Sequence, residues 1–63
     1  MSNRATFEVF QDTSDEWRWR LVAANGNIIA DSGEGYQSKQ GAQRGIESVK
    51  NSAATANIQH VDD

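Results

Sequence analysis

The sequence predicts an α+β fold in which three antiparallel strands precede one helix, within a single domain of residues 1–63. Apolar and polar residues alternate in the first half of the chain, and the apolar period changes to helical spacing after Tyr36. Between two strand-like runs stands Asn25-Gly26, a dipeptide typical of hairpin turns. Neither an internal repeat nor a linker-like segment divides the chain.

The first strand is expected over residues 5–11. Phe7 and Val9 share one face of this strand, because successive side chains of a strand point to opposite faces. Residues 12–15 are a polar cluster, and short polar side chains of this kind bond to the local backbone in turns. The chain is therefore expected to reverse at residues 12–15.

The second strand is expected over residues 16–24 and the third over residues 27–32. Asn25-Gly26 is expected to join them in a type I′ turn, since both residues tolerate the positive φ that this turn requires. Alternation along the second strand separates apolar from basic side chains: Trp17, Trp19 and Leu21 on one face, and Arg18 and Arg20 on the other.

A helix is expected over residues 39–52, with Ser38 as its N-cap. One apolar stripe follows from the helical spacing of Ala42, Ile46, Val49 and Ala53. Gly41 and Gly45 lie beside this stripe, and each costs a helix about 1 kcal/mol relative to alanine. Close approach of the helix to the tryptophan face would offset that cost.

The predicted core combines the apolar faces of the strands and the helix: Phe7, Val9, Trp17, Trp19, Leu21, Ile28, Ile46 and Val49. A domain of this size buries only about 60% of the surface of its unfolded chain. The sequence has no cysteine for a disulfide, and its single histidine, His60, cannot form a metal site alone. Oligomerisation is therefore the expected source of additional stability.

The net charge of −3 disfavours nucleic acid and anionic membranes as partners, since both require a positive field. No apolar run approaches the roughly 18 residues that suggest a membrane span. The first residues lack the apolar segment of a signal peptide, so a cytoplasmic location is expected.

Arg18 and Arg20 are the candidate ligand surface, because two guanidinium groups on one sheet face can bind phosphate or carboxylate. The alternative is a solvated face on which these arginines pair with Glu8 or Asp31.

Three further features each have a structural and a functional interpretation. Trp17 and Trp19 are either core residues or a stacking platform for a base or sugar ring. Ser38-Lys39 is either a simple helix cap or an anion site. His60 is either a surface or interface residue or a titrating group. No catalytic constellation is recognisable, so neither an enzyme nor a cofactor or metal is expected.

A series of short motifs follows in a fixed order along residues 5–51: Phe7-Glu8-Val9-Phe10, Trp19-Arg20-Leu21, Ala24-Asn25-Gly26, Ile28-Ile29-Ala30, Gly35-Tyr36, Ser38-Lys39 and Gly45-Ile46-Glu47-Ser48-Val49-Lys50. No single motif is specific. Their combination resembles the YegP-like family of small proteins, whose function is uncharacterised and which supplies no catalytic residues to transfer.

The resemblance implies a β-β-β-α-β unit that works in pairs. For a chain with one unit it implies a homodimer that shares one sheet and exchanges C-terminal strands. The exchanged strand would cover residues 57–61 and include Ile58, His60 and Val61. Without the resemblance, this tail is equally well interpreted as frayed. The expected function is a structural or protein-interaction module, and the alternative is an anion or nucleic-acid binder that uses Arg18 and Arg20.

Overall fold

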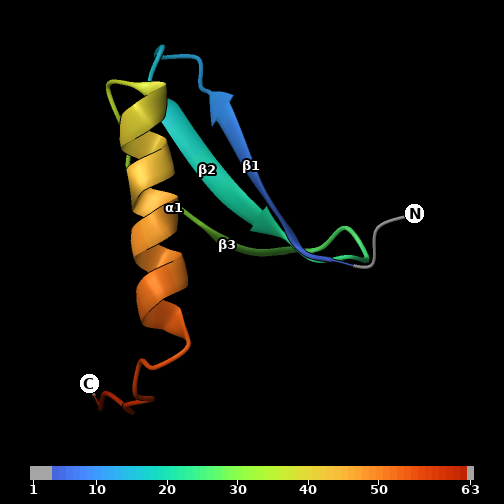
Figure 1. The fold of residues 1–63 in the computed structure, drawn as a ribbon, viewed down its shortest axis with the longest axis vertical. Helices are drawn as coiled ribbons and strands as arrows, with labels where there is room; N and C mark the ends of the chain where they lie inside the picture. Colours follow the sequence, from blue (N-terminus) through green and yellow to red (C-terminus); the bar gives the residue numbers. More distant parts are fainter. Residues whose placement is uncertain (1–3, 63) are drawn as a thin grey trace.

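The computed structural model describes residues 4–62, which form one three-stranded sheet and one helix. The elements are β1 (Thr6–Gln11), β2 (Trp17–Val22), β3 (Ile28–Asp31) and α1 (Lys39–Ala53). The strands are antiparallel in the order β1-β2-β3. Figure 1 shows α1 packed across one face of this sheet. The α+β class with three antiparallel strands and one helix is therefore confirmed.

The β1–β2 loop is organised by the side chain of Asp12. Its Oδ1 atom accepts hydrogen bonds from the backbone N–H groups of Ser14 at 2.8 Å and Glu16 at 3.0 Å. Asp15 has a φ of 64°, which makes it the one non-glycine residue with positive φ in the described chain. The polar cluster thus forms the turn by bonding to its own backbone.

The β2–β3 turn differs from the expected type I′ geometry. Gly26 N donates to Ala23 O at 2.9 Å, so Ala24 and Asn25 are the central residues of the turn. Gly26 has a φ of 93°, whereas Asn25 is not among the residues with positive φ. Asn25 Oδ1 accepts from Asn27 N at 3.0 Å, which fixes Asn25 in this turn and leaves Gly26 alone to take the left-handed conformation. The type I′ prediction is therefore wrong.

The helix begins where a capping side chain satisfies an unpaired N–H group of its first turn. Ser38 Oγ accepts from Gly41 N at 3.0 Å, and Ser38 itself has extended φ and ψ, as expected of an N-cap. Lys50 lies in the last turn, where a cation is favoured by the helix dipole. Ala42 and Ile46 are buried against the sheet.

The core lies between α1 and the β1–β2 part of the sheet. Trp19 is 5% exposed and packs with Ala42 and Ile46. Around this cluster lie partly buried side chains: Phe7, Val9, Trp17, Tyr36 and Val49. Phe7 and Trp19 meet edge to face, with ring centroids 5.5 Å apart.

Ile28 corrects the predicted core. Its side chain is 62% exposed, because α1 packs on β1 and β2 and leaves β3 uncovered. All four residues of β3 are exposed. The burial of Ile28 predicted from its apolar character is therefore wrong within this single chain.

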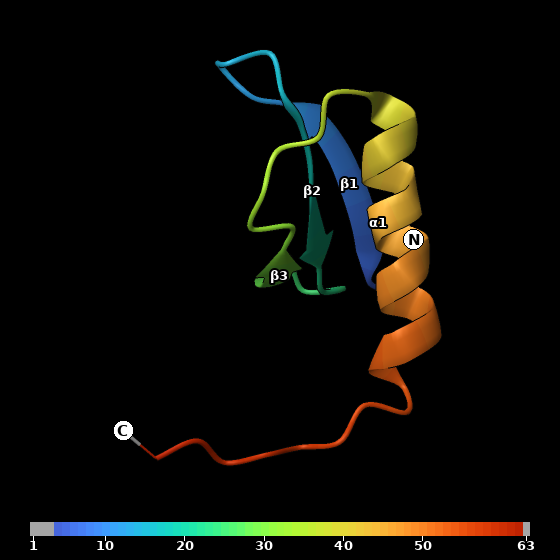
Figure 2. The ribbon, with the colours of Figure 1, turned by 90° about the vertical axis from the view of Figure 1, so that its left-hand side faces the viewer.

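After α1 the chain does not return to the sheet. Thr55 N and Ala56 N bond back to carbonyls of the last helical turn, at 3.3 and 3.4 Å. Residues 57–62, which we call the C-terminal arm, contain no strand and run outward beyond the end of α1 (Figure 2). The strand predicted at residues 57–61 does not form within the described chain, so its pairing with a second copy stays a prediction.

Candidate functional site

The candidate site is the sheet face opposite α1, which we call the open face. Because side chains alternate along β2, burial of Trp19 under α1 puts Arg18 and Arg20 on the open face. The register aligns Glu8 of β1 and Asp31 of β3 on either side of Arg20. This face therefore carries both charge signs in adjacent strands.

Arg20 is engaged by two side chains of β1. Its Nε atom donates to Glu8 Oε1 at 2.7 Å. Its guanidinium carbon lies 4.7 Å from the centroid of the Phe10 ring, a cation–π distance. The guanidinium group is thus held against its own sheet.

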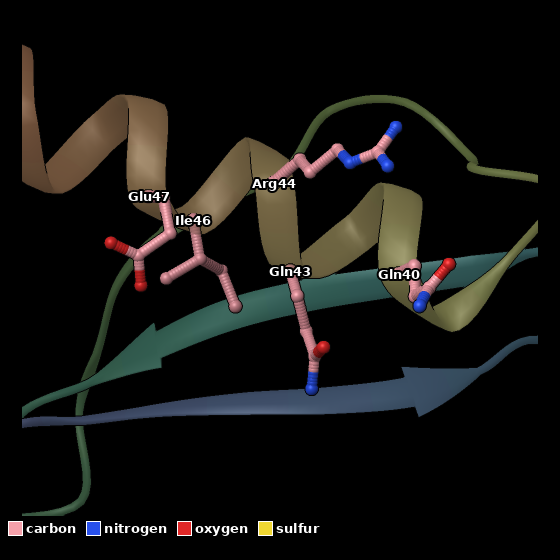
Figure 3. Close-up of a pocket in the computed structure, with 5 residues that line it drawn as sticks. All are labelled: Gln40, Gln43, Arg44, Ile46 and Glu47. Atoms are coloured by element: carbon pink, nitrogen blue, oxygen red, sulfur yellow. The ribbon is translucent and has the colours of Figure 1, made fainter.

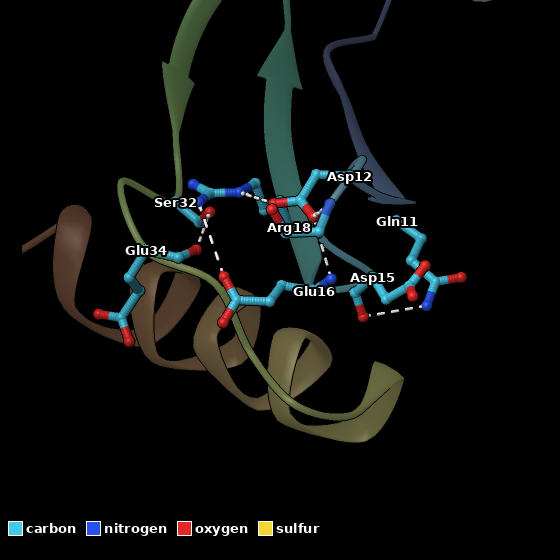
Figure 4. Close-up of polar contacts among 8 residues, drawn as sticks. Gln11, Asp12, Asp15, Glu16, Arg18, Ser32 and Glu34 are labelled. Atoms are coloured by element: carbon cyan, nitrogen blue, oxygen red, sulfur yellow. Dashed lines mark hydrogen bonds and ion pairs between the residues drawn. The ribbon is translucent and has the colours of Figure 1, made fainter.

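Arg18 is engaged by the β1–β2 loop (Figure 4). Its Nε atom donates to Asp12 Oδ2 at 2.6 Å, and its Nη2 atom lies 3.9 Å from Glu16 Oε1. The hydrogen bond from Arg18 lowers the pKa of the Asp12 carboxyl, and the same bond raises the pKa of Arg18. Asp12 thus links the loop backbone and the strand side chain.

The two arginines therefore do not form a shared cleft with exposed aromatic rings. Each guanidinium group points to a different acidic partner, and the one aromatic ring beside Arg20 is covered by it. The Nε–H group of each arginine is already used by Asp12 or Glu8, so an incoming anion would meet a guanidinium group whose charge is paired. The arrangement therefore does not support capture of a small anion by these two arginines acting together.

The aromatic pair does not form a stacking platform either. Trp19 is buried in the core, and Trp17 is half-buried with Lys39 Nζ 5.9 Å from its ring centroid. Ser38 Oγ is already used as the helix cap. His60 lies exposed on the C-terminal arm. Within residues 4–62 no three His, Cys, Asp or Glu side chains form a group able to hold a metal ion.

Two features of the structure were not predicted. Tyr36 pairs with Trp17 through two backbone hydrogen bonds of 2.8 Å and extends the sheet edge beyond β3. A groove of about 400 Å³ runs along α1 (Figure 3). The groove is lined by Gln40, Gln43, Arg44, Ile46 and Glu47. Gly45 was the available sequence signal for close packing of Tyr36, whereas nothing in the sequence indicated the groove.

α1 lacks the length and apolar run of a bilayer-spanning helix, and residues 4–62 contain no other candidate.

Comparison with known proteins gives consistent matches over most of the chain. Residues 12–59 match the family model described as Domain of unknown function (DUF1508). A UPF0339 protein of Neisseria meningitidis serogroup B is 46% identical over 55 residues, which cover 87% of this chain and 96% of that relative. A UPF0339 protein of Methanosarcina acetivorans is 50% identical over 52 residues, covering 82% and 88% of the two chains.

Two other matches bear on the architecture. A Haloferax volcanii protein solved by NMR in solution is 60% identical and superposes with a TM-score of 0.87, covering 95% of this chain and 100% of that one. A UPF0339 protein in the ptx operon 5′ region of Stutzerimonas stutzeri is 50% identical over 48 residues, which are 76% of this chain but 42% of that relative. The unit is therefore matched both in a chain of its own size and within a longer one.

Proposed function

This chain belongs to the DUF1508 family of unknown function, and we propose that it is a homodimeric structural or protein-interaction module whose first partner is a second copy of itself. The resemblance to YegP-like proteins agrees with this family membership. In the proposed dimer the two copies share one sheet and exchange their C-terminal arms.

The main support for the proposal is that the apolar side chains of the C-terminal arm are exposed. Ile58 is 92% exposed and Val61 is 80% exposed. Residues 57–62 form no hydrogen bond with any other described residue. Burial of apolar area is favourable by about 25 cal/mol per Å², so an arm of this composition gains free energy by docking. A second copy offers it a sheet edge.

The sheet also leaves edges to be covered. β1 and β3 are each paired on one side only, and unpaired strand edges promote association with other chains. An exchanged strand would satisfy such an edge and bury the arm in one step. The small core of the single chain gives association a further advantage, since only Trp19, Ala42 and Ile46 are buried among the described residues.

The longer Stutzerimonas relative supports pairing of units. This chain spans 42% of that relative, so the remainder is long enough for a second unit of the same size. Two units in one chain and two units in a homodimer could both cover the unpaired sheet edges and enlarge the small core of a single unit. The proposal includes no catalytic step, and a cytoplasmic location remains a prediction from the sequence.

Light scattering coupled to size exclusion tests the proposal directly. A homodimer is expected to give twice the chain mass of 6.9 kDa at micromolar protein concentration. A mass of a single chain across that concentration range would contradict the proposal.

A further inference from the structure

We infer that the acceptor for the partner's C-terminal arm is the outer edge of β1, beneath the adjacent flank of α1. This inference rests on the proposed dimer and adds which of the two sheet edges takes the arm.

The backbone of β1 presents a regular free edge. Asp12 N donates to Glu16 O at 2.8 Å, and the register continues this pairing from Gln11↔Trp17 back to Thr6↔Val22. In an antiparallel ladder the hydrogen-bonded pairs alternate, so even-numbered β1 residues bond to β2. Outward-facing N–H and C=O groups therefore belong to Phe7, Val9 and Gln11. These groups can bond a further strand without any rearrangement of the sheet.

The edge of β3 is a poorer acceptor. It has four residues against six in β1. Its register shifts, because Leu21 pairs with Ala30 while Val22 pairs with Ile28. Ile29 is thus an extra residue, and such irregularities bend a strand and interrupt further pairing at an edge.

One flank of α1 faces the β1 side of the sheet. Tyr36 lies on the β3 side of β2, because it pairs with Trp17 there, and it packs against the Gly41 and Gly45 flank of α1. With Ile46 toward the sheet, helical geometry puts Gln43 and Glu47 on the opposite flank, next to β1. Both residues line the groove of about 400 Å³, whose lining lies entirely on α1 (Figure 3). A strand added to β1 would therefore lie beside the flank of α1 that carries the exposed Gln43 side chain.

The arm fits this position in length and in side-chain pattern. Residues 57–62 match the six residues of β1. Ile58 and Val61 are three residues apart, so in a strand they face opposite sides. β1 offers an apolar neighbour on each side, with Val9 toward α1 and Phe10 on the open face. Each exposed apolar side chain of the arm thus gains a contact.

Intermolecular paramagnetic broadening tests this placement. The chain has no cysteine, so Gln59→Cys gives one nitroxide position in the middle of the arm. The spin-labelled variant, at natural isotope abundance, is mixed with ¹⁵N-labelled wild-type protein. The two proteins are unfolded and refolded together to form mixed dimers. We expect the strongest loss of amide signal in Thr6–Gln11, with a smaller loss in Ile28–Asp31. The same sample with the nitroxide reduced is the control.

The outcomes separate the edge assignment from the dimer itself. Strongest broadening in β3, or at neither edge, in a sample with dimer mass would overturn the assignment and leave the dimer intact. No intermolecular broadening together with the mass of a single chain would overturn both. Light scattering on the spin-labelled variant shows whether the label itself has changed the mass.

Discussion

The hydroxyl group of Tyr36 occupies the space that a Cβ atom on Gly45 would fill. The same Cβ would lie 2.9 Å from Tyr36 Cζ and 3.2 Å from Trp19 Nε1. Trp19 Nε1 is buried, and it has no hydrogen-bond partner in the described chain. Tyr36 is fixed by its backbone pairing with Trp17, which limits how far its ring can withdraw.

Gly45→Ala should therefore lower stability, although alanine is the better helix former. Overpacking costs about 1–3 kcal/mol, and improved helix propensity returns about 1 kcal/mol. We expect a net loss of about 1 kcal/mol in the free energy of unfolding, measured by urea denaturation.

Gly41→Ala is the matched control. A Cβ there would meet Ser38 Oγ at 3.3 Å and Tyr36 Cβ at 3.5 Å, which requires little movement. This variant should be neutral or more stable than wild type. Equal destabilisation by both alanines would show that the close approach to the Tyr36 hydroxyl group, which only Gly45→Ala makes, is not the cause.

The ion pair between Arg18 and Asp12 predicts a pH dependence of stability. The pKa of Asp12 is lower in the folded chain than its ordinary value of 3.8, chiefly because Arg18 donates a hydrogen bond to it. A depressed folded pKa stabilises the protein above the unfolded pKa, and the contribution is lost as the pH falls through the folded value. Wild type should therefore lose more stability on acidification below about pH 4 than Asp12→Asn does.

Urea midpoints measured from about pH 6 to about pH 2 check this difference. Asp62→Asn is the matched control, since it removes the same charge from a side chain that forms no hydrogen bond within the described residues. Parallel pH profiles for wild type and Asp12→Asn would contradict the assigned role of this ion pair.

Asp15 is predicted to prefer glycine over alanine. Its φ of 64° lies in the left-handed region, where a Cβ atom costs about 1–2 kcal/mol. Asp15→Gly should therefore be more stable than Asp15→Ala by about 1 kcal/mol in thermal or urea unfolding. At Ser14, which lacks positive φ, the order should reverse. A preference for alanine at both positions would disprove the strain argument.

The order of strands and helix was predictable because it depends on local patterns. Alternation around Trp19 and the Ser38 cap act within a few residues, and both are visible in the sequence. The exposure of Ile28 was not predictable in the same way, since it depends on which strands α1 covers. The β2–β3 turn failed because Asn25 and Gly26 fit more than one turn type, and a side-chain bond to Asn27 selects among them.

At the candidate site, too, local sequence patterns predicted some features, whereas others depend on the tertiary structure. Alternation along β2 was enough to put Arg18 and Arg20 on one face. Their partners were only half predicted. Glu8 was one of the two partners expected for these arginines, and it binds Arg20, whereas the bond of Arg18 to Asp12 depends on how the β1–β2 loop folds back. Such loop geometry is set by several backbone bonds together and has no sequence period.

Removal of the C-terminal arm is the most direct test of the proposed dimer. Deletion of residues 57–63 should convert the dimer to a single chain and lower the melting temperature, because it removes the apolar side chains of Ile58 and Val61 that are expected to dock on the partner. Mass by light scattering and melting by circular dichroism check the two effects.

In the full-length chain, the double substitution Ile58→Asp with Val61→Asp should also weaken the dimer, since it puts charge where apolar contact is expected. Asn57→Asp with Gln59→Glu adds the same charge beside the apolar positions and should weaken the dimer less. A deletion variant with unchanged mass and unchanged melting would rule out the exchange.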